Sequence, residues 1–239
     1  MDAHDNEILY DALAYKLPAG TSAVDRARMQ ILALSTTVLG QGTGFATAGS
    51  DRLRSKSLDR NSFNSGDWFN AQQWDCANGN GFGRGLPPAA DNRPKWDYAK
   101  PLLANPALVP DCAATAMAQA RFAELQAIRR SSPVFGLTAA AQVQQRLAFP
   151  LAGTGATPGV ITMTLDASGL GGPWRTVVVV FNANPNEATQ QLPGLAGHEV
   201  ALHPVLAASA DPVARQARFD RAAGIATVPA RTVSVFVRS

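Results

Sequence analysis

The spacing of apolar residues changes near Pro133, and this change constrains the fold more than any other feature. Before it, residues 24–35 and 113–130 carry apolar side chains at helical spacing. Thr21 and Ser22 directly precede the first of these segments and suit a helix N-cap. The region before Pro133 is therefore predicted to contain two substantial helices.

Short runs rich in β-branched residues follow Pro133 and are separated by Gly, Pro, Asn and Asp. These runs cover residues 146–151, 159–165, 175–182, 198–203 and 228–237. Residues 177–181 and 232–237 have the composition of sheet interiors. The last hundred residues or so are near the common size of an autonomous domain, so we expect a small antiparallel β-sandwich there.

A short apolar stretch and a long irregular segment lie between the two helical patterns. Gly40 and Gly42 end the first helix, and residues 43–48 are small and apolar, as in a strand buried within a sheet. Residues 49–109 lack a sustained period and are dense in Gly, Asn, Asp, Ser and Pro. Loops of this length are usually functional or disordered. The tryptophans and arginines of the segment argue against disorder.

Composition excludes several classes of protein. With 46% hydrophobic and 16% charged residues, the chain is typical of a globular protein. The 21 basic and 18 acidic residues give a net charge of only +3 without a basic run, so we expect no nucleic-acid partner. Residues 31–39 are interrupted by hydroxyl side chains, so we expect no membrane span. No secretion leader is visible before residue 20, and the compartment stays open.

The cysteines and histidines do not suggest a metal site. Cys76 and Cys112 are the only cysteines, and both a disulfide and two ordinary thiols fit them. They lack zinc-ligand spacing, and the three histidines lie far from them in sequence. His198 and His203 fall in or beside an expected strand and are interpreted as ordinary sheet residues. We expect no metal or other cofactor.

Several segments together carry a family signature. They are His4-Asp5-Asn6 and residues 48–70, 85–87, 100–106, 132–135, 146–150 and 158–161. These segments resemble the C-terminal region of pullulanases and limit dextrinases, which belong to the α-amylase superfamily (glycoside hydrolase family 13) and cut α-1,6 links in pullulan and starch. The resemblance covers essentially the whole chain.

The resemblance implies an α/β fold followed by an all-β domain. Residues 1–133 would be the C-terminal part of a truncated catalytic (β/α)8 TIM barrel, and residues 134–239 a C-terminal β-sandwich domain. Residues 43–48 would form the eighth barrel strand, and residues 113–130 the helix that closes the barrel. Since family members continue back into an apolar strand before the position of Met1, we expect this chain to be a fragment.

The tripeptide His4-Asp5-Asn6 is by itself only a polar tail or a capping turn. By resemblance, however, Asp5 is the aspartate that stabilises the oxocarbenium-like transition state of glycoside hydrolysis. His4 would hydrogen-bond sugar hydroxyls in the same subsite, with Asn6 beside it. The family's nucleophile and general acid lie on earlier strands and match nothing here. The isolated chain is therefore expected to be inactive.

Two further groups in the long segment suit binding of a sugar. Asp59 and Arg60 place a carboxylate beside a guanidinium, a combination that binds vicinal hydroxyls. By resemblance they lie near the non-reducing side of the cleaved bond, with Arg60 as the main contact and Asp59 holding it. The alternative is a surface ion pair of little consequence. Asp67 and Trp68 combine a hydrogen-bonding group with an aromatic face that can stack on a sugar.

Aromatic residues of such a loop also serve to pack it. This alternative stays open for Trp68 and is the interpretation favoured for Phe69, Trp74 and Trp96. Taken together, the resemblance implies part of a debranching hydrolase whose partner is an α-glucan such as pullulan, starch or limit dextrin. The alternative is a non-catalytic carbohydrate-binding or scaffold module that uses Arg60, Trp68 and the sandwich surface.

Overall fold

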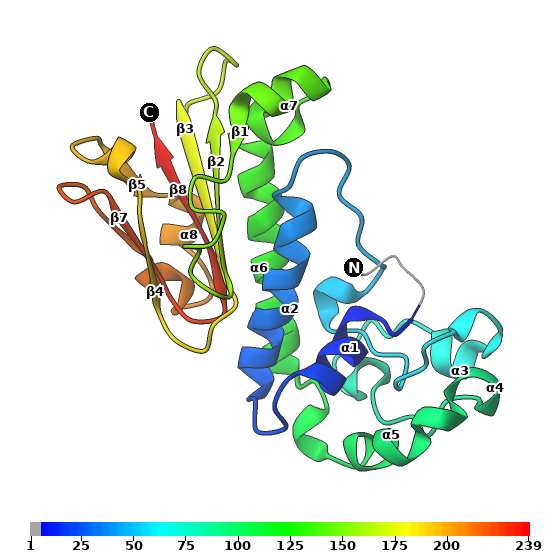
Figure 1. Cartoon of the computed structure of the whole chain (residues 1–239). Coiled ribbons are helices and arrows are strands. Elements are labelled where there is room, and N and C mark those ends of the chain that lie inside the picture. Colours follow the sequence, from blue (N-terminus) through cyan, green and yellow to red (C-terminus); the bar gives the residue numbers. More distant parts are fainter. Residues whose placement is uncertain (1–5) are drawn as a thin grey trace. The chain divides into compact units, whose positions relative to one another are not determined.

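The computed structural model describes residues 6–239, which form two compact units (Figure 1). The first contains the described residues up to Leu34 together with Phe45–Ala120, and the second contains Ser35–Gly44 and Arg121–Ser239. The predicted boundary after Pro133 therefore falls inside the second unit. The division runs within helix α2 (Ala23–Val38) and helix α6 (Cys112–Arg130).

The two predicted helices are confirmed. The hydroxyl of Ser22 accepts a hydrogen bond from the backbone N–H of Asp25 at 3.1 Å, so the expected N-cap of α2 is formed. In α6 burial does not simply follow apolar character, because Ala116 is exposed whereas Arg121 is only 3% exposed. A buried arginine on a helix face requires hydrogen-bond or ion-pair partners, and Arg121 has them in Glu124 and Ser209.

The long irregular segment folds into short helical pieces joined by loops. The α-helices of the first unit besides α2 and the start of α6 are α1 (Leu9–Lys16), α3 (Asp67–Asn70), α4 (Ala89–Asn92) and α5 (Trp96–Leu103). The 3₁₀ turns are η1 (Ser50–Arg52), η2 (Ser62–Asn64), η3 (Gly79–Gly81), η4 (Arg93–Lys95) and η5 (Pro106–Leu108). Such short pieces explain why the sequence shows no sustained period there.

The strand expected at residues 43–48 is wrong. Residues 43–47 take no regular structure, and Phe45 is 67% exposed. A strand requires a neighbouring strand to pair its backbone groups. Between residues 6 and 146, the described chain contains no strand with which this segment could pair. A small apolar composition therefore did not suffice to form an element.

The second unit contains two antiparallel sheets (Figure 1). The larger has the order β1-β2-β3-β8-β5, with bounds β1 Leu147–Ala148, β2 Val160–Asp166, β3 Thr176–Asn182, β8 Thr232–Arg238 and β5 Val200–Leu202. The smaller has the order β4-β7-β6, with β4 Ala188–Gln191, β7 Ile225–Val228 and β6 Arg218–Asp220. The helical elements are α7 (Ala140–Arg146), α8 (Pro204–Ala207), η6 (Pro133–Gly136), η7 (Pro193–Leu195) and η8 (Ala214–Gln216).

The inner faces of the two sheets share one hydrophobic core. Val178, Val180 and Phe236 of the larger sheet cluster with Ala226 and Val228 of the smaller, and each of the five is at most 1% exposed. Burial of each valine or phenylalanine side chain stabilises the folded state by about 1.5–3 kcal/mol. The unit thus has the sandwich-like architecture expected from its β-rich runs.

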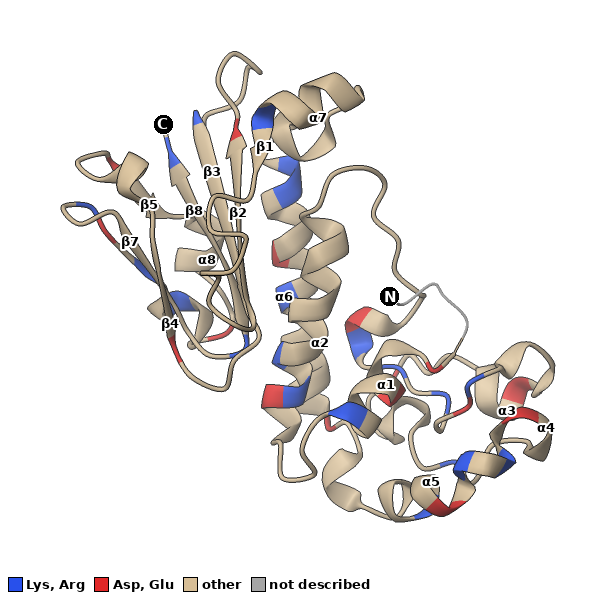
Figure 2. Cartoon of the chain, viewed as in Figure 1, with Lys and Arg blue, Asp and Glu red and all other residues tan. Residues whose placement is uncertain are grey.

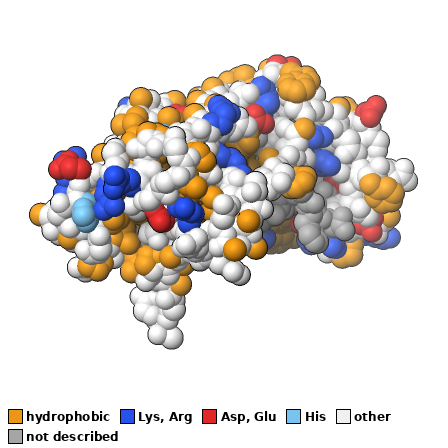
Figure 3. Space-filling view, turned by 90° about the horizontal axis from the view of Figure 1, so that it is seen from above, with side chains coloured by type: hydrophobic (Ala, Val, Ile, Leu, Met, Phe, Trp, Pro, Cys, Tyr) orange, Lys and Arg blue, Asp and Glu red, His pale blue; other side chains and the backbone are white. Residues whose placement is uncertain are grey.

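Charged residues of both signs are interspersed along the chain (Figure 2). On the face seen in Figure 3, hydrophobic side chains occur in small groups among polar and charged ones. Among the described residues, no helix combines the length and the apolar character that crossing a bilayer demands.

Candidate functional site

Asp11 of α1 organises the loop that carries the predicted binding residues. Its side chain is fully buried, and Oδ2 accepts hydrogen bonds from the backbone N–H groups of Lys56 at 2.9 Å and Leu58 at 3.1 Å. Oδ1 contacts the hydroxyl of Ser55. Ser57 and Leu58 have positive φ angles of 53° and 65°, a conformation that costs energy in residues other than glycine. The buried carboxyl therefore holds a strained loop in one shape.

Burial raises the pKa of Asp11 to about 7, although the hydrogen bonds from Ser55, Lys56 and Leu58 act in the opposite direction. The Ser55 hydroxyl donates to Oδ1, while Oδ2 accepts from both backbone amides. Sequence reasoning missed Asp11. The available signal was an acidic residue inside an apolar helical run, since Leu9, Tyr10 and Ala14 of the same helix are also buried.

Asp59 follows this loop and is only 1% exposed. Its Oδ1 accepts hydrogen bonds from the backbone N–H of Asn61 and from the side-chain amide of Asn92, both at 3.0 Å. The amide oxygen of Asn92 in turn accepts from the backbone N–H of Arg60 at 3.0 Å. A buried Asp59 is not half of a surface ion pair. It fixes the backbone around Arg60 through Asn92.

The guanidinium of Arg60 is exposed and donates to the side-chain oxygen of Asn6 at 2.9 Å, across 54 residues of sequence. Beside it, Lys95 forms a 2.6 Å ion pair with Glu7. Burial alone would raise the pKa of Glu7, but the hydrogen bond from Lys95 and the charges of Lys95 and Arg60 outweigh it and lower the pKa. We call Asn6, Glu7, Asp59, Arg60, Asn92 and Lys95 the Arg60 cluster.

His4 and Asp5 lie outside the described residues. The next residue, Asn6, is described, and its side-chain oxygen accepts a hydrogen bond from Arg60 of the predicted binding loop.

Trp68 forms a second candidate surface. The residue is 65% exposed, and its indole N–H donates to the carbonyl oxygen of Arg84 at 2.9 Å. The Arg84 guanidinium donates back to the carbonyl oxygen of Trp68 and lies 5.7 Å from the ring centroid. The ring borders a cleft of about 550 Å³ whose other principal side chains are Asp67, Gln73, Asn78, Phe82 and Arg84. Such an exposed ring does not serve chiefly to pack the loop.

The remaining aromatic residues of the segment differ from one another. Trp96 is half-buried and its indole N–H donates to the carbonyl oxygen of Pro87 at 3.0 Å, as expected of a loop anchor. Phe69 is also half-buried. Trp74 is 74% exposed, so the expectation that it anchors the loop is wrong.

Cys76 and Cys112 form a disulfide with their Cα atoms 4.9 Å apart, which decides between the two alternatives left by the sequence. The bond joins the loop beside the Trp68 cleft to the start of α6. In the part of the chain that the structure describes, no three His, Cys, Asp or Glu side chains are grouped as metal ligands.

His203 lies in the second unit and is only 3% exposed. Its Nδ1 accepts from the backbone N–H of Val205 at 3.2 Å, which caps α8, so Nε2 carries the proton and donates to the hydroxyl of Ser131 at 3.0 Å. That hydroxyl donates to the carbonyl oxygen of Ile128. Burial lowers the pKa of His203 to about 4. His203 is therefore a neutral, fully hydrogen-bonded structural residue, whereas His198 is exposed.

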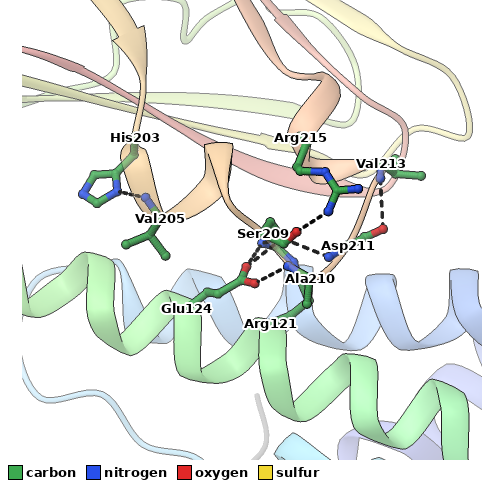
Figure 4. Close-up of polar contacts among 9 residues, drawn as sticks. All are labelled: Arg121, Glu124, His203, Val205, Ser209, Ala210, Asp211, Val213 and Arg215. Carbon is green, nitrogen blue, oxygen red and sulfur yellow. Dashed lines mark hydrogen bonds and ion pairs between the residues drawn. The ribbon is translucent and has the colours of Figure 1, made fainter.

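The buried Arg121 finds its partners in a network of the second unit (Figure 4). It donates to the carboxylate of Glu124 one turn along α6 and to the hydroxyl of Ser209 at 3.0 Å. Glu124 also accepts from the hydroxyl of Ser209 and from the backbone N–H of Ala210, both at 2.8 Å. These groups satisfy one another and attach the loop after α8 to α6. They are structural, and sequence reasoning did not identify them.

Comparison with known proteins identifies the family. Residues 77–239 match the family described as alpha-1,6-glucosidases, pullulanase-type, C-terminal. This chain belongs to the pullulanase-type α-1,6-glucosidases. Among its relatives is pullulanase 1 of Arabidopsis thaliana chloroplasts, which is 40% identical over all of this chain and 26% of its own length. A pullulanase of Klebsiella pneumoniae is 32% identical over 97% of this chain and 21% of its own length.

Solved pullulanase structures share the fold. PulA from Klebsiella oxytoca superposes with a TM-score of 0.86 at 31% identity, over 98% of this chain and 22% of the other. A maltotriose complex of PulA from Klebsiella pneumoniae gives a TM-score of 0.87 at 31% identity, over 99% of this chain and 26% of the other. The chain thus spans about a quarter or less of the pullulanases that it matches, in keeping with a C-terminal fragment.

Proposed function

We propose that this chain is the C-terminal part of a debranching glycoside hydrolase that cleaves α-1,6-glucosidic bonds in pullulan, starch or limit dextrin. The single observation that carries this beyond family membership is the hydrogen bond between Asn6 and Arg60. It brings the end of the His4-Asp5-Asn6 motif to the loop that Asp11 and Asp59 hold in shape. Two segments that resemble the family's substrate-binding parts thereby meet.

In this proposal Asp5 stabilises the developing positive charge of the oxocarbenium-like transition state. His4, Asn6 and Arg60 hydrogen-bond hydroxyls of the bound sugar, and the planar guanidinium of Arg60 suits a vicinal pair. Asp59, being buried, acts by positioning Arg60 rather than by touching the glucan. Asp67 and Trp68 contribute a further sugar contact.

The fold of the complete enzyme and the location of its catalytic groups follow from the same proposal. Residues 1–133 would complete a (β/α)8 barrel when the upstream strands are present, and residues 134–239 would be the C-terminal sandwich domain. The residues 43–47, without a partner strand here, would then find one. Because the nucleophile and general acid have no counterpart in this chain, the isolated chain would not hydrolyse glucans.

Hydrolysis of pullulan tests this proposal. The chain alone and the same chain extended upstream through the missing barrel strands are compared, together with Asp5→Ala in the extended protein. Only the extended protein should release sugar, and Asp5→Ala should reduce its rate by several orders of magnitude, the loss typical of a group that stabilises transition-state charge. Asp97→Ala, whose carboxylate is 98% exposed on α5, is the matched control and should retain the rate.

Two outcomes contradict parts of the proposal. Pullulan hydrolysis by the purified chain alone would refute its expected inactivity. An inactive extended protein that still binds α-glucan would favour the alternative, a non-catalytic carbohydrate-binding module, for which the exposed ring of Trp68 is the specific observation.

A further inference from the structure

The cleft beside Trp68 shares no residue with the Arg60 cluster. Its volume of about 550 Å³ lies within the range of small-ligand sites, which are commonly about 300–1,000 Å³. We propose that this cleft is a separate glucan-binding site, in which the indole of Trp68 stacks on a glucosyl ring. The ligand class rests on the proposed function, whereas the existence and position of the site rest on the following contacts.

The Trp68 ring is held in place although it is exposed. Its indole N–H and its backbone carbonyl oxygen are both bound by Arg84, one through the arginine's carbonyl oxygen and the other through its guanidinium. The guanidinium also lies over the ring at 5.7 Å, while 65% of the residue stays open to a ligand. A ring fixed before binding loses little conformational freedom when a ligand stacks on it.

The polar groups of the cleft fit a neutral ligand with many hydroxyls. Asp67 supplies a carboxylate, Arg84 a guanidinium, and Gln73 and Asn78 supply amides that both donate and accept. The negative charge of Asp67 balances the positive charge of Arg84, so the lining has no net charge that would favour a phosphate or another anion. The C–H face of a sugar ring can stack on the indole of Trp68, and the hydroxyls of the sugar can form hydrogen bonds with these polar side chains.

The half-buried Gln73 adds a polar group to the wall of the cleft. Its side-chain oxygen is buried and has no hydrogen-bond partner among the described residues. Buried acceptors are nearly always paired in proteins, and an unpaired one calls for an explanation. A ligand hydroxyl could pair with this oxygen only after the Gln73 side chain turns it toward the cleft.

The disulfide keeps this side of the cleft in place. Cys76 lies between Gln73 and Asn78 and is bonded to Cys112 at the start of α6. Trp74 of the same segment is 74% exposed but does not line the cleft, so the chain itself offers a matched aromatic control.

Titration of the ¹⁵N-labelled 239-residue chain with maltotriose tests the site. The indole N–H signal of Trp68, assigned by its loss in Trp68→Phe, should shift with saturation, and the Trp74 signal should not. Trp68→Ala should weaken binding at the cleft by about tenfold, the equivalent of one well-packed aromatic contact. Trp68→Phe, which keeps an aromatic face but loses the donor to Arg84, should show a smaller effect.

Trp74→Ala should bind maltotriose as the parent chain does, and Arg60→Ala should leave the shift of the Trp68 signal unchanged. Unaltered backbone amide signals elsewhere would show that each variant is folded. Three results overturn the proposal: no shift of the Trp68 signal at saturating maltotriose, unchanged affinity in Trp68→Ala, or loss of the shift in Arg60→Ala. None of these depends on pullulan hydrolysis, so failure of this site and failure of the proposed function are distinguishable.

Discussion

At the scale of single residues, the buried carboxyl of Asp11 has the largest influence on the candidate site. It is the acceptor around which Ser57 and Leu58 adopt positive φ angles, and the chain then continues into Asp59 and Arg60. An anionic side chain at full burial is unfavourable, which is why its pKa is raised to about 7. The loop is therefore held by a group that can carry a proton near neutral pH.

The protonated form leads to a first prediction at this scale. Asp11→Asn imitates the neutral acid, since an amide can donate where the acid proton would and accept where Oδ2 does. We expect it to raise the free energy of unfolding at neutral pH, because the folded parent must take up a proton or bury an anion there and the amide does neither. Asp11→Ala leaves buried donors unpaired and should be less stable than Asp11→Asn by more than about 2 kcal/mol. Chemical denaturation of both variants measures this. Equal destabilisation by the two substitutions would contradict it, and exposed Asp97→Asn is the control.

At the scale of elements, periodicity located the helices well and the strands unevenly. Helices α2 and α6 and strands β2, β3 and β8 fall where the sequence places them. Strands β4 and β6 were missed because their sequences, ATQQ and RFD, carry little β propensity. They are strands because β7 pairs with both. The segment 43–48 shows the converse case, because its composition suits a strand but the described part of the first unit has no strand for it to pair with.

The disulfide gives a prediction at the scale of elements. It closes a loop with a sequence separation of 36 residues. This loop contains all of α4 and α5, whereas α3 precedes it. In the chain-entropy model such a closure is worth about 4 kcal/mol. The double variant Cys76→Ser, Cys112→Ser should therefore lower the unfolding midpoint of the first unit and increase proteolytic cleavage between Trp68 and Asn78. The parent chain with its disulfide reduced should show the same changes as the double variant. Unchanged proteolytic cleavage in the double variant and in the reduced parent would contradict the prediction.

At the scale of the whole molecule, the two units differ in their exposed hydrophobic side chains, and we expect them to respond to pH in opposite directions. Six of the eight most exposed large hydrophobic side chains belong to the first unit, namely Phe45, Phe63, Trp68, Trp74, Tyr98 and Val109. Such exposure marks interaction surfaces or a tendency to aggregate. This fits a first unit that is completed by further chain in the proposed full-length enzyme, and a second unit with a core of its own.

The pH response follows from one group in each unit. Asp11 has a pKa of about 7 in the folded state, against an ordinary value of 3.8. Its contribution to stability is therefore complete below pH 3.8 and is lost as the pH rises to about 7. His203 has a folded pKa of about 4 against an ordinary 6.5, so the unfolded state binds the extra proton in that window and stability falls as pH falls through it. Lowering the pH should strengthen the first unit and weaken the second.

Hydrogen exchange, corrected for the intrinsic effect of pH, measures this in each unit. Between pH 7 and pH 5, opening of residues 53–60 should become rarer and opening of residues 203–209 more frequent. His198→Gln, at an exposed position of the second unit, should leave both changes intact, whereas Asp11→Asn should abolish only the first. A shift of both units in the same direction would show that at least one of the two groups does not govern the response of its unit.

The sequence by itself determined the two main helices, the β-rich second half, the family and the residues proposed to meet the glucan, because each depends on local spacing or on a run of matching residues. Only the tertiary structure decided that Cys76 and Cys112 are bonded, that Asp59 is buried and supports Arg60 through Asn92, and that Asp11 is buried while Trp68 and Trp74 are exposed. The physical reason is that pairing, burial and desolvation depend on groups that are distant along the chain, such as Asn6 and Arg60, and no local pattern records which distant group will arrive.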